Sequence, residues 1–205
     1  MRRLSLIIII LTLLSSCHAE HAKGYLTFSG TLENSKDSTL TILGDGLTKI
    51  IKISDNGTFK DTLKVSEAGL FNIYTSSNKR GIVFLKNGYH IKLTSNSNDF
   101  FNSFKCEGND EGEESNNFFV SRYNFGQRSG NIRGFMILEK EAFKSKINYF
   151  RKGMDSISKI YPNANKLIVN DSDEQYEIFF KKLEDNYDVM HAQILEQVIS
   201  EEKLK

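Results

Sequence analysis

The feature that most constrains the fold is a short-range alternation of apolar and polar residues between Tyr25 and Glu107. A period of two places every second side chain on one face of a β-strand, so each run predicts a strand buried on that face. Asn56-Gly57 and Asn87-Gly88 indicate hairpin turns, because both residue types tolerate positive φ. About eight strands are expected, at residues 26–32, 40–42, 51–53, 59–63, 69–74, 81–85, 89–93 and 101–106.

These strands follow one another without intervening helical segments. That order is typical of a β-sandwich or a partly open barrel, and not of a parallel α/β sheet. We expect an antiparallel β-sandwich over residues 24–108. The run from Gly81 to Leu85 is apolar throughout, which predicts a central strand. Residues 101–106 carry apolar side chains on both faces, so the pattern does not determine which face is buried.

The pattern beyond residue 108 becomes helical. Residues 108–114 are acidic and contain glycine, which is typical of a solvated linker, and residues 118–125 suit a short helix. From Phe143 to Ile160, apolar residues recur every three or four positions and predict a longer helix, which Pro162 ends. A second long helix is expected to begin at 171–173, where aspartates favour a helix N-terminus.

The second long helix carries a heptad-like apolar stripe. Its members are Tyr176, Phe180, Leu183, Tyr187, Met190 and Ile194. Such a stripe packs against a neighbouring helix or the sheet, or it docks a partner protein. We therefore expect an α+β fold with a helical region at residues 109–205 that contains a C-terminal α-helical hairpin. The six stripe residues are the candidate partner-docking surface.

The N-terminus has the composition of a secretory signal. Arg2 and Arg3 precede an apolar run that is too short to span a bilayer. The segment Leu14-Ser15-Ser16-Cys17 resembles the bacterial lipobox, in which the cysteine is acylated and the peptide before it is removed. This predicts a signal peptide at 1–16, lipidation at Cys17 and a lipidated tether at 17–23. The alternative is a secreted protein in which Cys17 follows the cleavage site by chance.

The predicted location is the bacterial cell envelope. His18 and not Asp follows Cys17, which favours attachment to the outer membrane but does not determine the leaflet or the face. The expected orientation is toward the periplasm. The chain has 27 Lys and Arg against 26 Asp and Glu, and loss of Arg2 and Arg3 changes the net charge from +1 to −1 (1 − 2). A near-neutral chain lacks the positive excess that drives nucleic-acid binding. The expected partners are the membrane and an envelope protein.

Motifs for catalysis or for cofactor binding are absent from the sequence. There is no Cys-x-x-Cys, phosphate-binding loop, dinucleotide-binding glycine pattern or His-Glu-x-x-His. We expect a non-enzymatic protein without cofactor or metal. Acylation of Cys17 leaves Cys106 as the one free thiol, which is expected to be buried, although a monothiol could form a regulatory mixed disulfide.

A weaker candidate for ligand binding lies in the segment from Phe118 to Phe135. Its arginines alternate with aromatic residues and could bind an anionic ligand or a glycan, or they could simply be surface charge. The candidate ligand-binding residues are Arg122, Arg128 and Arg133. The two histidines outside the tether are expected to have no functional role. His90 is expected to point outward on its strand, and His191 to be partly exposed on the last helix.

Several segments resemble the N-terminal accessory domain, itself of unknown function, of bacterial envelope lipoproteins in the thiol–disulfide oxidoreductase and peroxiredoxin-like family. Besides the lipobox they are 24–32, 55–59, 83–93, 104–109 and 161–164. The resemblance covers most of the chain after residue 17 and implies an accessory module. In that family a thioredoxin-fold domain with a Trp-Cys-x-x-Cys site follows. No position up to Lys205 matches that site, so no catalytic residue is carried over.

The family pattern also has glycine where this chain has Cys106. We therefore expect a lipid-anchored binding or scaffolding module of the cell envelope, with a thioredoxin-like protein as a possible partner. The alternatives are a redox role for Cys106 and the binding of a small ligand or glycan.

Overall fold

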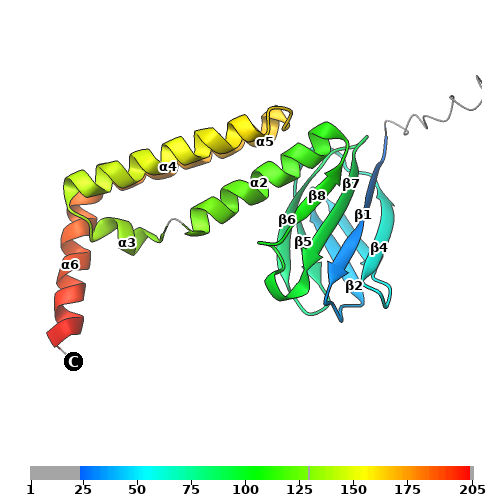
Figure 1. Ribbon diagram of the computed structural model, residues 1–205, viewed down its shortest axis with the longest axis horizontal. Coiled ribbons are helices and arrows are strands. Elements are labelled where there is room, and N and C mark those ends of the chain that lie inside the picture. The colour runs from blue at the N-terminus through cyan, green and yellow to red at the C-terminus, as the bar shows by residue number, and fades with distance from the viewer. Residues whose placement is uncertain (1–23, 129, 204–205) are drawn as a thin grey trace, which may run out of the picture.

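A computed structural model describes residues 24–128 and 130–203 (Figure 1). The eight expected strands are present in its first half, so the prediction of an α+β chain with an N-terminal β-sandwich is confirmed. The strands are β1 Leu26–Glu33, β2 Thr39–Gly44, β3 Leu47–Lys52, β4 Thr58–Leu63, β5 Gly69–Thr75, β6 Arg80–Leu85, β7 His90–Asn96 and β8 Lys105–Gly108. The predicted signal peptide and tether lie outside the described residues.

The strands form two four-stranded sheets, ordered β4-β1-β7-β8 and β3-β2-β5-β6. Every pair is antiparallel except β1 with β7, which is parallel. A wholly antiparallel sandwich was therefore a wrong expectation at this pair. The five strands between β1 and β7 give the chain the long crossover that a parallel pair requires.

The alternation of the sequence matches the burial of the strands. Leu26, Phe28 and Leu32 of β1 are all at most 1% exposed, and they face the opposite sheet across the core. Gly30 lies on the same inner face. A residue with a side chain does not fit there, because its Cβ would lie 1.9 Å from the carbonyl oxygen of Leu93. A side chain would therefore force β1 and β7 apart.

Two expectations about the strands were wrong. β6, expected at the centre of its sheet, is an edge strand, and it is apolar because a helix covers it. The last strand is shorter than expected. Residues 101–104 follow the short 3-10 helix η1, Ser97–Asp99, and their phenylalanines pack edge-to-face in a turn before β8 begins at Lys105.

The acidic segment predicted as a linker is the start of α2, Asp110–Arg128. Its carboxylates suit that position, since Asp110, Glu111 and Glu113 lie at the positive end of the helix dipole. α2 also absorbs the short helix expected at 118–125. Phe118 is completely buried and belongs to the sandwich core, together with Ile168 from the helical region. The core therefore crosses the boundary predicted at residue 108.

Two adjacent asparagines of α2 bond to the edge strands of both sheets. Asn116 accepts from the Phe84 backbone N–H at 2.8 Å and donates to its carbonyl at 3.0 Å, on β6. Asn117 makes the same pair of bonds to Cys106 on β8, at 2.9 Å each. Each side-chain amide satisfies a backbone N–H and a carbonyl that a neighbouring strand would otherwise pair with. In this way α2 covers one open side of the sandwich.

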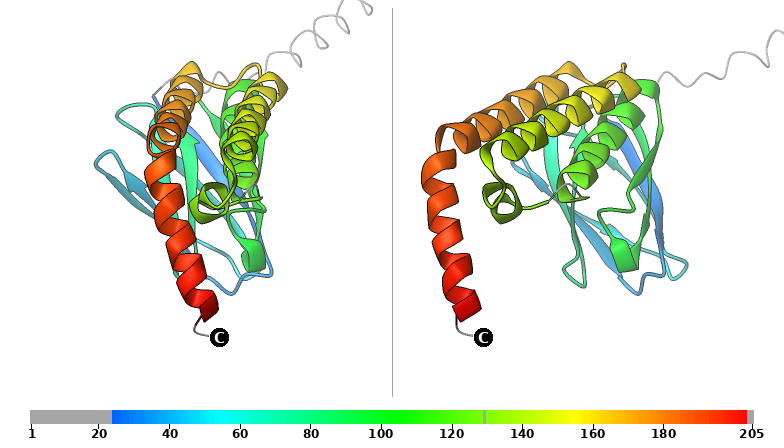
Figure 2. Two further views of the ribbon diagram at one scale, coloured as in Figure 1. Left: turned by 90° about the vertical axis from the view of Figure 1, so that its left-hand side faces the viewer. Right: turned by 60° about the vertical axis from the view of Figure 1, so that its left-hand side comes forward.

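The remaining helices form an arm that extends beyond the sandwich (Figures 1 and 2). They are α3 Ile132–Met136, α4 Lys140–Ile160, α5 Lys166–Asp185 and α6 Tyr187–Lys203. The predicted hairpin is α4 with α5. α5 begins earlier than expected, because Asn165 caps it by accepting from the Leu167 N–H at 3.0 Å. The predicted single helix also ends at Asn186, which separates α5 from α6.

The arm has an apolar core of its own. Phe143, Ile147 and Phe150 of α4 are buried against Phe180 and Leu183 of α5. α4 also lies close to α2, because a Cβ at Gly153 would stand 2.1 Å from the ring of Phe125. The stripe on α4 therefore serves packing, mainly within the arm, except at its last member Ile160, which is exposed.

We predict that Asn116→Ala lowers the free energy of unfolding by about 1–3 kcal/mol, because it leaves the buried N–H and carbonyl of Phe84 without partners. Denaturant titration measures this change. Asn124→Ala is the matched control, since its amide bonds at the exposed surface to the Asn102 carbonyl, and its cost should stay within about 0.5 kcal/mol. Equal losses in the two variants would contradict the edge-covering role.

Candidate functional site

An apolar hollow opens where α5 passes the sandwich. Its volume is about 370 Å³. Phe119 of α2, Ile168 of α5 and Leu70 of β5 contribute apolar walls, whereas Asp171 and Gln175 add polar atoms from one side of α5. A mainly apolar lining with a few polar groups is the composition of small-molecule sites.

A second hollow of about 700 Å³ continues along the same helix into the arm. Tyr176 and Phe179 line both hollows, so we call the continuous surface the α5 groove. The second part adds Phe135 and Phe150 with the polar side chains of Gln127, Asn131 and Arg133. Phe179 is 38% exposed at the junction and presents an aromatic face to a ligand.

Arg122 holds the α5 side of the groove in place from the interior of the protein. Its guanidinium is 2% exposed and donates to Ser172 at 2.9 Å, to Ser158 at 2.7 Å and to Asp173. It also lies 5.9 Å from the ring centroid of Tyr176. These contacts join α2, α4 and α5. Burial raises the pKa of Tyr176 above its ordinary value.

The three arginines proposed to bind an anion do not form one site. Arg122 is buried and its two terminal guanidinium nitrogens already bond to partners from α4 and α5, which corrects its assignment as a ligand-binding residue. Arg128 is exposed at the end of α2. Arg133 lines the groove but pairs with Glu201 at 2.8 Å. Arg122 and Arg128 point in different directions from α2, and Arg133 belongs to a separate helix, α3.

The stripe proposed as a docking surface is largely internal. Phe180, Leu183 and Tyr187 are at most 4% exposed in the core of the arm, while Met190 and Ile194 pack against that core with part of their surface. These residues therefore agree with the other role predicted for the stripe, which is the packing of a helical hairpin. Tyr176 lines both hollows of the groove, and Phe180 also borders the second one. The proposal of a docking surface made of all six residues is therefore corrected.

Cys106 is 1% exposed at the edge of β8. Burial, with the charge of Glu113 as a smaller cause, raises the pKa of its thiol to about 12. A thiol in this position is neutral at physiological pH and out of reach of a partner disulfide. The structure therefore favours the inert role over the mixed disulfide.

The histidines take part in local packing. Nδ1 of His90 lies 2.5 Å from the Thr27 hydroxyl, and Nδ1 of His191 lies 2.5 Å from the Met136 carbonyl while its ring stacks on Tyr187. Among the described residues, no group of three His, Cys, Asp or Glu side chains could hold a metal ion. Within the same residues, no helix has the length and apolar character needed to cross a membrane. Cys17 lies outside them.

Comparisons with known proteins leave the function open. No family model matches the chain, and no curated protein matches it at a significant level. A solved structure of a DUF3823 family protein from Bacteroides ovatus is similar to this chain, with 15% sequence identity and a TM-score of 0.24. The match covers 36% of this chain and 44% of that protein, and it is too weak to carry an argument. The resemblance to an oxidoreductase accessory domain stays a prediction.

Sequence patterns did not reveal the groove. Leu70 belongs to a strand on the sandwich and Gln175 to the polar side of a helix, and nothing in the sequence connects these positions. Phe179 carried a partial signal, because it is a large apolar residue beside the stripe and not in it. An aromatic residue off the buried stripe of an amphipathic helix is therefore the clue that sequence offers.

We predict that Cys106 in the folded protein hardly reacts with a disulfide reagent. In a Cys17→Ser variant it is the one thiol, and a rise of its pKa from 9.0 to about 12 lowers the thiolate fraction at pH 8 about a thousandfold. Reaction with dithiobis-nitrobenzoate, followed with and without guanidinium, measures this. Equal rates for folded and unfolded protein would restore the redox hypothesis.

We also predict that Asp173→Ala destabilises the fold by about 2–3 kcal/mol, because the Arg122 guanidinium stays buried without its counter-charge. Glu177→Ala on the same helix is the control. Its partner Arg151 lies at the surface, so the loss should stay below about 1 kcal/mol. Chemical denaturation compares the two variants, and a smaller loss for Asp173→Ala would show that Arg122 does not hold α5 through charge.

Proposed function

We propose that this protein is a non-catalytic, lipid-anchored binding module of the bacterial cell envelope, and that the α5 groove binds its ligand. The signal and lipobox pattern ending at Cys17 supports the location. The observation that carries the binding role is the pair of joined hollows with exposed Phe179 at their junction. The sequence pattern favours attachment to the outer membrane, facing the periplasm.

The lining of the groove favours an amphipathic small ligand, such as an oligosaccharide. Rings of Phe119, Tyr176 and Phe179 offer apolar faces, and Gln175 and Asp171 offer hydrogen-bonding groups beside them. Sugar rings have one apolar face and a rim of hydroxyl groups, and this lining complements both.

We predict that some member of a panel of neutral and anionic oligosaccharides raises the unfolding midpoint of the protein, because ligands that bind the folded state stabilise it. Phe179→Ala should weaken that binding about tenfold or more, equivalent to about 1.4 kcal/mol. Thermal-shift titration gives both results. Ile178→Ala is the matched control: Ile178 is 42% exposed on α5 but does not line the groove.

Two outcomes would contradict this role for the groove. Either no oligosaccharide shifts the midpoint, or Phe179→Ala and Ile178→Ala bind equally well. A Cys17→Ser variant tests the anchor separately, since it should leave the membrane fraction while its unfolding midpoint stays the same.

A second candidate function is the docking of an envelope protein, such as a thioredoxin-like protein. The observation that favours it is α6, which presents Val189 at 62% and Ile199 at 51% exposure at the far end of the arm. These exposed apolar residues can contact a partner, whereas the buried residues of the stripe cannot.

A further inference from the structure

One end of the molecule gathers segments that are far apart in the sequence. The carbonyl of Tyr25, just before β1, accepts a hydrogen bond from the Gly88 N–H at 2.7 Å in the β6–β7 turn. Lys86 of that turn pairs with Glu111 of α2 at 2.9 Å, and Glu111 also accepts a hydrogen bond from Asn165 at the start of α5. We call this region, formed by Tyr25, 86–89, 110–111 and 159–167, the entry end.

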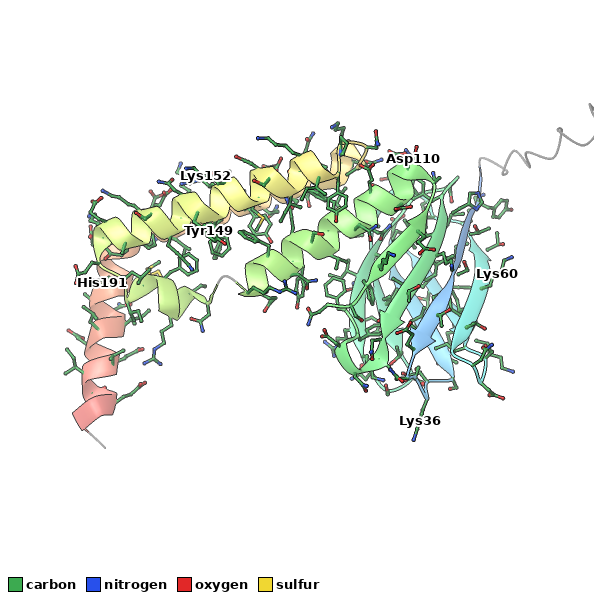
Figure 3. All side chains as sticks on the ribbon, viewed as in Figure 1. Lys36, Lys60, Asp110, Tyr149, Lys152 and His191 are labelled. Carbon is green, nitrogen blue, oxygen red and sulfur yellow. The ribbon has the colours of Figure 1, made fainter. Side chains whose placement is uncertain are left out.

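The figures show the same arrangement. The α4–α5 turn and the start of β1 lie on the same side of the molecule in Figure 1 and in both views of Figure 2. In Figure 3, Asp110 lies at this end, and Lys36 lies at the opposite end of the sandwich. The chain therefore enters the described fold at the same end of the molecule as the α4–α5 turn (Figures 1 and 2).

The entry end exposes large apolar side chains. Ile160, the last residue of α4, is 65% exposed, and Leu167, in the first turn of α5, is 61% exposed. Both values are far above those of the other apolar residues of the α4 stripe, which are at most 9% exposed. Tyr25 adds an aromatic ring at 50% exposure. Apolar residues grouped at a turn are typical of a surface that meets a partner or a membrane.

Charged groups at this end fall into two sets. Lys159 and Lys166 are exposed, and each precedes one of the apolar residues in the sequence. Lys64 lies 5.9 Å from the ring of Tyr25. The nearby carboxylates are largely engaged in the fold: Glu111 bonds to Lys86 and Asn165, and Glu114 accepts from the Asn163 backbone N–H and side-chain amide. Asp110 stays exposed.

The tether fixes where this end can be. Tyr25 lies eight positions after Cys17 (25 − 17), and a fully extended chain of eight steps spans at most about 29 Å. An acyl anchor on Cys17 would therefore hold the entry end close to the bilayer surface.

From this geometry we propose that the entry end lies directly against the lipid bilayer. Tyr25, Ile160 and Leu167 enter the boundary between headgroups and acyl chains, and Lys159 and Lys166 contact headgroup phosphates. Tyrosine and basic residues are common at this depth, where an apolar body and a polar tip are both accommodated. The proposal rests on the proposed lipid anchor, because the tether is what brings this end to the membrane.

The experiment uses the absence of tryptophan from the chain. Single variants Ile160→Trp and Leu167→Trp of the full lipidated protein are reconstituted into vesicles of phosphatidylethanolamine and phosphatidylglycerol, with or without brominated acyl chains. Bromine quenches tryptophan that reaches the acyl chains. Ile50→Trp is the matched control, because Ile50 is 63% exposed on β3, where the outer face of the sandwich is not part of the entry end.

We expect brominated lipid to lower the fluorescence of Ile160→Trp and Leu167→Trp at least about twofold and to leave Ile50→Trp nearly unchanged. Equal quenching of all three, or none in the first two while the protein still floats with the vesicles, would overturn the orientation alone. Failure to float, with an unmodified Cys17 by mass spectrometry, would instead overturn the lipid anchor, and this proposal with it.

Discussion

The structure depends on the contact that α2 makes with both sheets at once. A sandwich of two four-stranded sheets has unpaired backbone groups at its edges, and β6 and β8 lie at edges that face the same helix. Asn116 and Asn117 satisfy one backbone N–H and one carbonyl on each strand. Because two consecutive residues bond to different sheets, the position of α2 is determined in rotation and in translation. The sandwich and the helical region therefore form one unit.

The arm takes its position from α2 in turn. The guanidinium of Arg122 is buried among residues of α4 and α5 and bonds to both helices, so it holds the hairpin against α2. The hairpin leaves an open space between α5 and Leu70 of β5. This space is the first hollow of the α5 groove. The same geometry places the α4–α5 turn at the end of the molecule where β1 begins (Figures 1 and 2). The proposed ligand site and the proposed membrane contact thus follow from one packing arrangement.

Sequence patterns predicted the strands well because burial on one face imposes a period of two on each strand. They failed where a residue's role depends on a distant neighbour. β6 is uniformly apolar because α2 covers it, and the sequence cannot distinguish this from a central position in the sheet. The acidic residues 110–114 are compatible with a solvated linker and with a helix N-terminus. The helix forms because Glu111 and Glu114 bond to distant residues of the fold. Arg122 resembled a surface arginine for the same reason.

The sequence by itself determined the number of strands, the faces they bury, the presence of a helical hairpin and the expectation of a lipid anchor at Cys17, because local period and composition carry those features. The tertiary structure alone decided that β1 pairs with β7 in parallel, that Phe180, Leu183 and Tyr187 pack inside the arm, and that Phe179 stands at a groove. Periodicity specifies which side of an element is apolar. What covers that side depends on residues far away in the chain, which local patterns do not encode.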